Sequence, residues 1–238
     1  MISTSRPLLA CALAAAVVLS GCGAAGTTGS RPGAGSTTAT AESPQQFLAR
    51  LEAATSEADS VSMTISGDLM RGSGKARLAD DPASSFHLNA DDGSTDLIVV
   101  DGTVYARDGG DSAARWQTVP ADEAIGLADG FTPSGTFRAM REGAKSVVSK
   151  GPEDLQGTPT TKYELTVDTV AAGAASGVTP SPSTPDTVYS IWVGADDLLH
   201  RVSVDLDGST LVVDYSGWGD PVEVVAPPAD QVDGAPTS

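Results

Sequence analysis

The side chains that could support acid–base or nucleophilic chemistry are few and widely separated along this chain. Its two imidazoles are His87 and His200. No Gly-x-Ser-x-Gly motif places an activated serine beside either of them, so the spacing does not indicate an acyl-transfer triad. A zinc site needs about four nitrogen, sulfur or carboxylate ligands, whereas these histidines lie at unrelated positions, far from Cys11 and Cys22. The residue types therefore give no indication of an enzyme.

Two short motifs resemble ion or phosphate sites but lack essential positions. Asp205-x-Asp207-Gly208 resembles the start of a calcium loop, yet no glutamate follows where the loop needs its bidentate ligand. We interpret this motif as a hairpin turn. Gly72-Ser73-Gly74-Lys75 lacks the first glycine of a phosphate-binding loop, because Leu69 occupies that place. We therefore predict no catalytic residue, no cofactor and no metal ion.

Cys22 is the side chain with the clearest chemical setting. Arg6 precedes a run of twelve apolar residues, Leu8 to Leu19, which is too short to span a bilayer but suits a secretory signal. Leu19-Ser20-Gly21-Cys22 resembles a bacterial lipobox, where cleavage before the cysteine leaves an N-terminus bearing diacylglycerol and a fatty acid such as palmitate. We predict a signal peptide over residues 1–21 and a lipid anchor at Cys22. The alternative is a cysteine that lies by chance near an ordinary cleavage site.

The charge balance limits the partners of the chain. It has 14 basic and 31 acidic residues, a formal net charge of −17, and loss of the signal with Arg6 makes this about −18. Phosphate backbones and anionic membrane surfaces repel such a surface, so we predict no nucleic-acid partner. Several acyl chains on Cys22, rather than charge, would hold the protein at the extracytoplasmic face of the cell membrane. Since Cys11 is lost with the signal, no disulfide can form within the mature chain.

Composition divides the 238 residues into a tether, one folded domain and a short tail. Residues 23–41 are rich in Gly, Ser, Thr and Ala and cannot build a core. We therefore assign residues 22–42 to the lipidated cysteine and a flexible tether, 43–232 to a single domain, and 233–238 to a disordered tail.

The folded domain opens with a helix signal, followed by strand signals. Ser43, Pro44 and Gln46 form a capping box at the start of a helix, whose apolar face contains Phe47, Leu48, Leu51 and Ala54. Period-two alternation and turn residues then predict antiparallel strands. These strands cover residues 61–69, 75–79, 85–90, 95–100, 103–107, 146–150 and 161–168, with three more between 188 and 215.

Three segments interrupt this strand pattern. Between residues 120 and 142 the spacing predicts two short helices, one containing Ile125 and Leu127. Residues 171–186 are rich in Ala, Gly, Ser and Pro and predict a mobile loop. Ala226-Pro227-Pro228 cannot continue a ladder because proline lacks the N–H, so we expect the sheet to end there. The predicted class is α+β, a curved antiparallel open half-barrel of about ten strands with short helices covering its concave face.

Several segments together carry a family resemblance. They are the lipobox, the helix at 44–54, the hairpin Leu97-Ile98-Val99-Val100-Asp101-Gly102-Thr103-Val104-Tyr105-Ala106, the strand Thr161-Lys162-Tyr163-Glu164-Leu165-Thr166-Val167-Asp168, and Ile191-Trp192-Val193 with Trp218-Gly219-Asp220-Pro221 and Ala226-Pro227-Pro228-Ala229. Their order and spacing resemble the actinobacterial LppX/LprG lipoprotein family over nearly all of residues 44–232. The resemblance implies a fold similar to the lipoprotein carrier LolA, with an apolar pocket between the sheet and its helices. Family members carry acylated lipids or glycolipids across the cell envelope. The loop at 171–186 and the 5% aromatic content depart from the family and leave the ligand class open.

The apolar positions of the predicted strands would line such a pocket. They are Val61, Met63, Ile65, Phe86, Leu88, Leu97, Val99, Tyr163, Leu165, Val167, Ile191, Val193, Val202, Val204, Leu211 and Val213. The alternative is an ordinary filled core, since alternation is the same for a packed face and a hollow one. Phe131, Phe137 and Met140 would either gate the pocket or pack as plain helix-to-sheet contacts.

Two functions remain open at this stage. The first is a monomeric lipid-binding carrier that extracts or presents an acylated lipid or glycolipid at the membrane. The second is a tethered interaction module, a sensor or assembly factor with a filled interior. The sequence identifies neither the lipid nor a transporter or other protein partner.

Overall fold

The computed structural model of the protein describes residues 42–119, 131–175, 181, 183–206 and 208–233. Its helices within these ranges are α1 (Pro44–Glu57), α3 (Pro133–Arg141), α4 (Thr169–Ala175) and the 3-10 helix η1 (Ala229–Gln231). Its strands are β1 (Ser60–Gly67), β2 (Met70–Arg77), β3 (Ala83–Ala90), β4 (Gly93–Val100), β5 (Thr103–Asp108), β6 (Trp116–Val119), β7 (Ala144–Leu155), β8 (Thr158–Val167), β9 (Thr187–Val193), β10 (Leu199–Leu206), β11 (Ser209–Ser216) and β12 (Val232–Asp233).

All described strands belong to one open sheet of 12 strands, in the order β12-β6-β5-β4-β3-β2-β1-β11-β10-β9-β8-β7. Two antiparallel meanders, β1 to β6 and β7 to β11, are joined where β1 pairs with β11, with Ile65 opposite Val213. Strands β12 and β7 form the two edges. The predicted α+β class and open antiparallel sheet are confirmed, with 12 strands in place of about ten.

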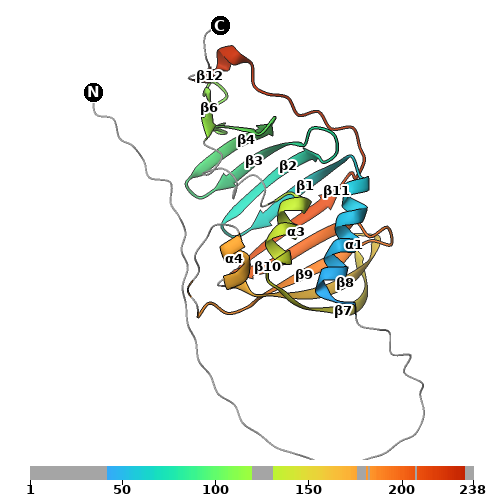
Figure 1. Ribbon diagram of the computed structural model, residues 1–238. Coiled ribbons are helices and arrows are strands. Elements are labelled where there is room, and N and C mark those ends of the chain that lie inside the picture. The colour runs from blue at the N-terminus through green and yellow to red at the C-terminus, as the bar shows by residue number, and fades with distance from the viewer. Residues whose placement is uncertain (1–41, 120–130, 176–180, 182, 207, 234–238) are drawn as a thin grey trace, which may run out of the picture.

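Helices cover one face of this sheet, as Figure 1 shows. Helix α1 contacts β7 and α3, and α3 in turn contacts α4. We call the side that carries these helices the helix face and the opposite side the outer face. The apolar side chains of the two meanders meet α1 and α3 on the helix face, so the main core lies there.

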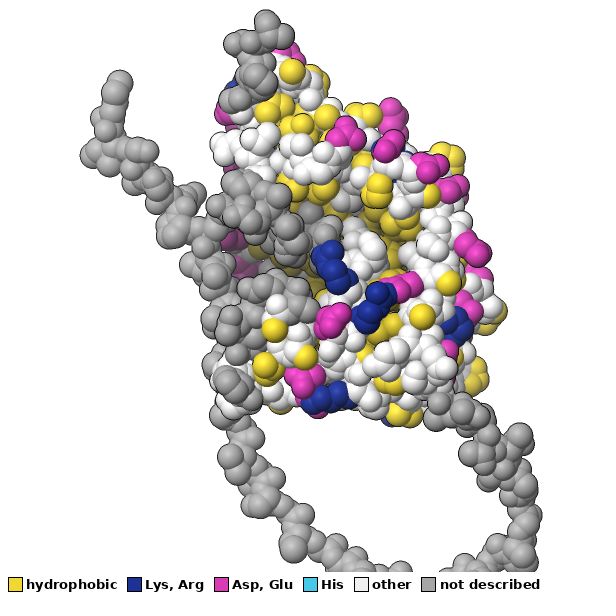
Figure 2. All heavy atoms as spheres, viewed as in Figure 1, with side chains coloured by type: hydrophobic (Ala, Val, Ile, Leu, Met, Phe, Trp, Pro, Cys, Tyr) yellow, Lys and Arg dark blue, Asp and Glu magenta, His cyan; other side chains and the backbone are white. Residues whose placement is uncertain are grey.

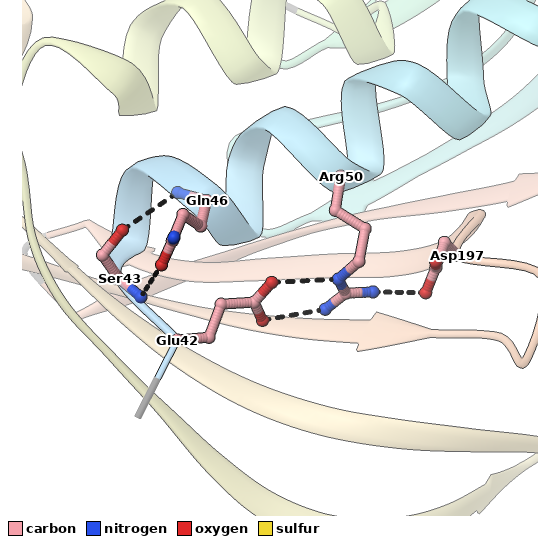
Figure 3. A network of polar contacts seen from close by, with 5 residues as sticks. All are labelled: Glu42, Ser43, Gln46, Arg50 and Asp197. Carbon is pink, nitrogen blue, oxygen red and sulfur yellow. Dashed lines mark hydrogen bonds and ion pairs between the residues drawn. The ribbon is translucent and has the colours of Figure 1, made fainter. Parts of the chain in front are cut away.

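The start of α1 has the predicted capping box (Figure 3). The backbone N–H of Gln46 donates to Ser43 Oγ at 3.2 Å, and the Ser43 N–H donates to Gln46 Oε1 at 3.1 Å. Pro44 occupies the first turn, where its missing N–H costs nothing. With the helix starting at this residue, Phe47 and Leu51 lie on the face of α1 that packs into the core.

Arg50 fixes the first half of α1 to the sheet (Figure 3). Its Nε and Nη2 atoms each lie 3.1 Å from a carboxylate oxygen of Glu42, and its Nη1 donates to Asp197 in the β9–β10 turn. The hydrogen bond to Glu42 is the main cause of the raised pKa of Arg50, which burial opposes and Asp197 supports. Arg50 thus ties α1 to the turn between β9 and β10.

The loop predicted over residues 171–186 is wrong at its start, because α4 extends from Thr169 to Ala175. The Asp168 carboxylate accepts the N–H groups of Val170 and Ala171, both at 3.0 Å, and so caps the first turn. Alanine then favours the helix. Residues 176–180 and 182 lie outside the described residues, as do Ile125 and Leu127 of the first helix predicted in the 120–142 insertion. The second of those helices is α3.

The prediction that the sheet ends at residues 226–228 is also wrong. Val222 and Val224 pack on the outer face against Ala83 and Val100, and this contact directs the chain past β3 and β4. Strand β12 then pairs in parallel with β6. The pairing includes Asp233, so only residues 234–238 of the predicted tail lie outside the described part of the chain.

Candidate functional site

The helix face gathers the residues that the sequence predicted to line a pocket. Most of them belong to one cluster with Phe47, Leu48 and Leu51 of α1. The buried members are Val61, Met63, Ile65, Phe86, Leu88, Leu97, Phe137, Met140, Leu165, Val167, Ile191, Val193, Val202 and Val213, with Tyr163 and Leu211 partly buried against them. Val204 is buried outside this cluster, and Val99 is half-buried. Their contact with a lipid stays a prediction.

The part of this face beneath the first half of α1 is closely packed. Leu165, Val167 and Ile191 are each 0% exposed. The ring of Phe47 lies 4.7 Å from the ring of Tyr163, measured between centroids. Side chains of α1 therefore occupy the space above β8 and β9.

The residues proposed as a gate take two positions. Phe137 and Met140 of α3 are each 1% exposed and lie in the cluster, where they pack the helix on the sheet. Phe131, just before α3, is partly buried, and its ring centroid lies 6.0 Å from that of Phe86.

Open space remains where the C-terminal half of α1 meets the N-terminal end of α3. We call this the α1–α3 pocket; its volume is about 410 Å³, which lies within the 300–1,000 Å³ typical of ligand sites. It is lined by Glu52, Thr55, Ser56, Ala76, Arg77, Leu78, Pro82, Ala83, Ser84, Val99, Thr132, Ser134 and Phe137. Figure 2 shows hydrophobic side chains at the surface between these helices and the sheet.

Strand β2 leaves room on the helix face because three of its four inward positions are small. Met70 packs against the core, whereas Gly72, Gly74 and Ala76 are small, and Ala76 lines the pocket. A Cβ atom on Gly74 would lie 2.2 Å from Cδ1 of Phe86, so glycine is required for that ring to lie over β2. The motif Gly72-Ser73-Gly74-Lys75, which resembled a phosphate-binding loop, is therefore part of a strand, and its glycines make room for side chains of β3.

Polar groups stand at the rim of the α1–α3 pocket. Glu52 of α1 forms an ion pair with Arg141 of α3, which ties the two helices together. Thr132 Oγ1 accepts the N–H of Gly135 at 3.2 Å and so caps α3. Thr55 is 6% exposed, and its Oγ1 has no hydrogen-bond partner among the described residues.

A second, smaller apolar hollow lies beside Phe131. Its volume is about 170 Å³, and it is formed by the β1–β2 and β10–β11 hairpins. Leu69 and Leu206 stand at its border with 61% and 47% of their surface exposed. Leu211 is the only member of the predicted lining set that borders this hollow.

Tyr215 of β11 connects the sheet to α3. Its hydroxyl lies 3.3 Å from Thr136 Oγ1 and donates to the carbonyl of Phe131 at 3.4 Å. Burial raises the pKa of Tyr215 to about 12, and the hydrogen bond with Thr136 partly opposes this rise. The phenol therefore stays neutral and can act as a donor throughout the physiological range.

Neither His87 nor His200 lines the α1–α3 pocket. His87 Nδ1 is 2.7 Å from Asp96 Oδ1 on the outer face, and Arg107 binds the other carboxylate oxygen at 2.9 Å. Burial opposes ionisation of Asp96, but the hydrogen bonds from His87 and Arg107 outweigh it and lower the pKa of Asp96. Within the described ranges no three His, Cys, Asp or Glu side chains come together as a metal site would require. Asp207 of the calcium-like motif lies outside these ranges.

Sequence reasoning missed Thr55 and Thr132 as pocket residues. For Thr55 a signal existed, because Phe47, Leu51 and Thr55 recur at the four-residue spacing of one helix face. The face was instead extended to Ala54, which left the single buried hydroxyl of α1 unnoticed. No comparable signal marks Thr132, whose position depends on how α3 lies against α1.

The fold and the pocket define an open antiparallel sheet that carries helices over one apolar face, and two solved structures share this architecture. LprF from Mycobacterium bovis is 19% identical, with a TM-score of 0.56 over 77% of this chain and 96% of that one. The lipoprotein LppX from Mycobacterium tuberculosis is 17% identical, with a TM-score of 0.54 over 75% of this chain and 98% of that one. The resemblance to the LppX/LprG proteins is thus confirmed for the fold.

Comparisons of sequence alone give no further relatives. No protein-family model matches the chain, and no curated protein does. In the part of the chain that the structure describes, no helix has the length and apolar character needed to cross a membrane. Cys22 and the predicted signal peptide lie outside that part.

Proposed function

We propose that this protein is a membrane-anchored lipoprotein of the cell envelope that binds an acylated lipid or glycolipid and carries or presents it. The observation that carries the proposal is the α1–α3 pocket, a space of about 410 Å³ between two helices and an apolar sheet face. The fold shared with LprF and the lipoprotein LppX supports it. The protein acts as a monomeric binding module and not as an enzyme.

The physical basis is burial of hydrocarbon. Each methylene moved from water into the pocket contributes about 0.8 kcal/mol, so even a few methylenes against Ala76, Val99 and Phe137 give useful affinity. Glu52 and Arg141 form an ion pair above the same space. The polar part of a bound lipid would lie beside this pair at the pocket rim.

The anchor places this pocket near its ligand. Acylation at Cys22 holds the chain at the extracytoplasmic face of the membrane, where lipids are available. Residues 23–41 form a Gly-rich tether that spans on the order of 25 Å as a flexible coil. The tether therefore lets the pocket approach the bilayer, and no positively charged surface is needed to bind the membrane.

One observation favours the second candidate, a tethered interaction module. Leu165, Val167, Ile191 and most other predicted lining residues are packed by α1 and α3, as in an ordinary core. Such a module would use its surface to bind a protein and would carry no lipid.

Native mass spectrometry distinguishes these functions. The chain beginning at residue 23, which lacks Cys22, is purified from two different hosts without added detergent. Co-purified lipid that leaves on collisional activation supports carriage. A clean mass of the protein alone from both hosts, and after incubation with a mixed lipid extract, contradicts it.

A further inference from the structure

We propose that the α1–α3 pocket recognises the carbonyl group of an acyl chain through the hydroxyl of Thr55. This inference rests on the proposed lipid-binding function and adds a residue that selects the ligand. It separates acyl lipids, whose chain ends in a carbonyl, from plain hydrocarbons of equal length. A free fatty acid and a fatty acyl ester both carry this carbonyl, which accepts the hydrogen bond.

Thr55 stands in an unusual position for a polar residue. It continues the buried stripe of α1 that contains Phe47, Leu48 and Leu51, and it is 6% exposed. An aliphatic residue there would complete the apolar face of the helix. The chain instead places a hydroxyl where it borders the pocket.

The hydroxyl of Thr55 is both buried and, within the described ranges, unpaired. A threonine in a helix commonly bonds the carbonyl one turn earlier, but Thr55 Oγ1 has no partner among the described residues. The backbone carbonyl of Thr55 already accepts the N–H of Ala58 at 3.2 Å, which closes the helix. Nearly all buried polar groups are paired in native proteins, so an unpaired hydroxyl that lines a pocket indicates a partner supplied from outside.

The neighbouring hydroxyls differ from Thr55 in this respect. Ser56 Oγ donates to the carbonyl of Ala53 at 2.8 Å, and Thr132 Oγ1 accepts from Gly135. Both are therefore engaged in ending or starting a helix. Thr55 alone combines deep burial, a pocket wall and an unpaired donor among the side chains of α1 that the structure describes.

The surrounding walls suit an acyl chain. Ala76 of β2, Leu78 just after it, Val99 of β4 and Phe137 of α3 offer apolar surface. In this proposal a hydrocarbon chain lies against these side chains, and its carbonyl oxygen accepts a hydrogen bond from the Thr55 hydroxyl. A saturated alkane satisfies the walls but leaves this donor unpaired.

The test compares three ligands of the same chain length. The full chain carrying Cys22→Ala, which has no acyl group of its own at that position, is purified after export. Binding of palmitate, methyl palmitate and hexadecane is measured by displacement of a fluorescent fatty acid. Tighter binding of palmitate would indicate a site for free fatty acids, and tighter binding of methyl palmitate a site for fatty acyl esters.

Thr55→Val keeps the shape of the side chain and removes the hydroxyl. We expect it to weaken the tighter carbonyl ligand about five- to tenfold, the effect of one hydrogen bond, with hexadecane unchanged. Thr55→Ser restores the donor and should recover most of that loss. Thr118→Val is the matched control, because the same change is made at an exposed position of β6 that does not line the pocket, and it should leave binding of all three ligands unchanged.

The outcomes separate this inference from the function on which it rests. Equal effects of Thr55→Val on hexadecane and on the carbonyl ligands, or no effect on either, overturn the role of Thr55 while lipid binding stands. Failure of the Cys22→Ala parent to bind any of the three ligands overturns the proposed function itself. Thermal unfolding of each variant confirms that the comparisons are made on folded protein.

Discussion

Two substitutions to tryptophan, Val99→Trp and Leu165→Trp, distinguish a pocket from a filled core within the same molecule. Val99 is half-buried and lines the α1–α3 pocket, whereas Leu165 is 0% exposed in the packed cluster. Both face the helices from the sheet. The same change in size should therefore have different consequences at the two positions.

At Val99 the indole enters space that a ligand would use. Displacing two or three methylenes of a bound chain costs about 1.6–2.4 kcal/mol, which weakens binding about 15- to 60-fold. The melting temperature should change by less than about 2 °C, since the ring fills an existing hollow.

At Leu165 no such space exists. Overpacking a dense core costs about 1–3 kcal/mol, and each kcal/mol lowers the melting temperature of a domain of this size by about 2–4 °C. Leu165→Trp should therefore lower the melting temperature by about 2–12 °C while the remaining folded protein keeps its lipid affinity.

Lipid affinity from fluorescent displacement and thermal unfolding by circular dichroism, measured on both variants, test this reasoning. Unchanged lipid affinity in Val99→Trp would show that the α1–α3 pocket is not the binding site. Similar losses of stability in both variants would show that the pocket is as tightly filled as the core beneath α1.

Three further predictions concern the sheet, the connection to α3 and the anchor. Gly74→Ala should destabilise the fold by about 1–3 kcal/mol, because its Cβ meets the ring of Phe86, whereas Ser73→Ala on the outer face should have little effect in urea denaturation. Burial raises the pKa of Tyr215 to about 12 from an ordinary value of about 10, so the folded state retains this proton longer than the unfolded state. The stability from neutral Tyr215 is full below about pH 10 and is lost as the pH rises toward 12; Tyr215→Phe should make this alkaline loss less steep, and an identical slope would contradict the assignment. Cys22→Ala should move the protein from the membrane fraction to the soluble fraction, with loss of the lipid mass from its N-terminal peptide.

The sequence was most informative where one local rule decides the structure. The capping box at Ser43 and Gln46 fixes the first turn of α1 because both partners lie within four residues. The alternation of Val61, Met63 and Ile65 identifies the buried side of β1. Such rules depend on neighbours in the chain, so they survive without knowledge of the tertiary structure.

Strand β2 shows why a strand was predicted only in part: the prediction covered residues 75–79, whereas β2 extends from Met70 to Arg77. Gly72 and Gly74 occupy inward positions that most strands fill with apolar residues, so the period-two signal is lost there. The reason for glycine at residue 74 lies on the neighbouring strand β3, because the ring of Phe86 occupies the space that a Cβ atom would take. The strand count fell short by β6 and β12. Strand β12 was missed because its two residues pair with β6, more than a hundred positions earlier in the chain.

The position of the pocket could not be predicted because it depends on how two helices divide the helix face. Alternation assigned Leu165 and Val99 to the same side of the sheet and could not separate them. Arg50 holds the first half of α1 against the β9–β10 turn, which fills the region around Leu165. The second half of α1 then lies near the end of β2, where the small side chain of Ala76 and the neighbouring Val99 border the pocket. The pocket thus arises where a helix fixed to the β9–β10 turn passes over small side chains of the sheet.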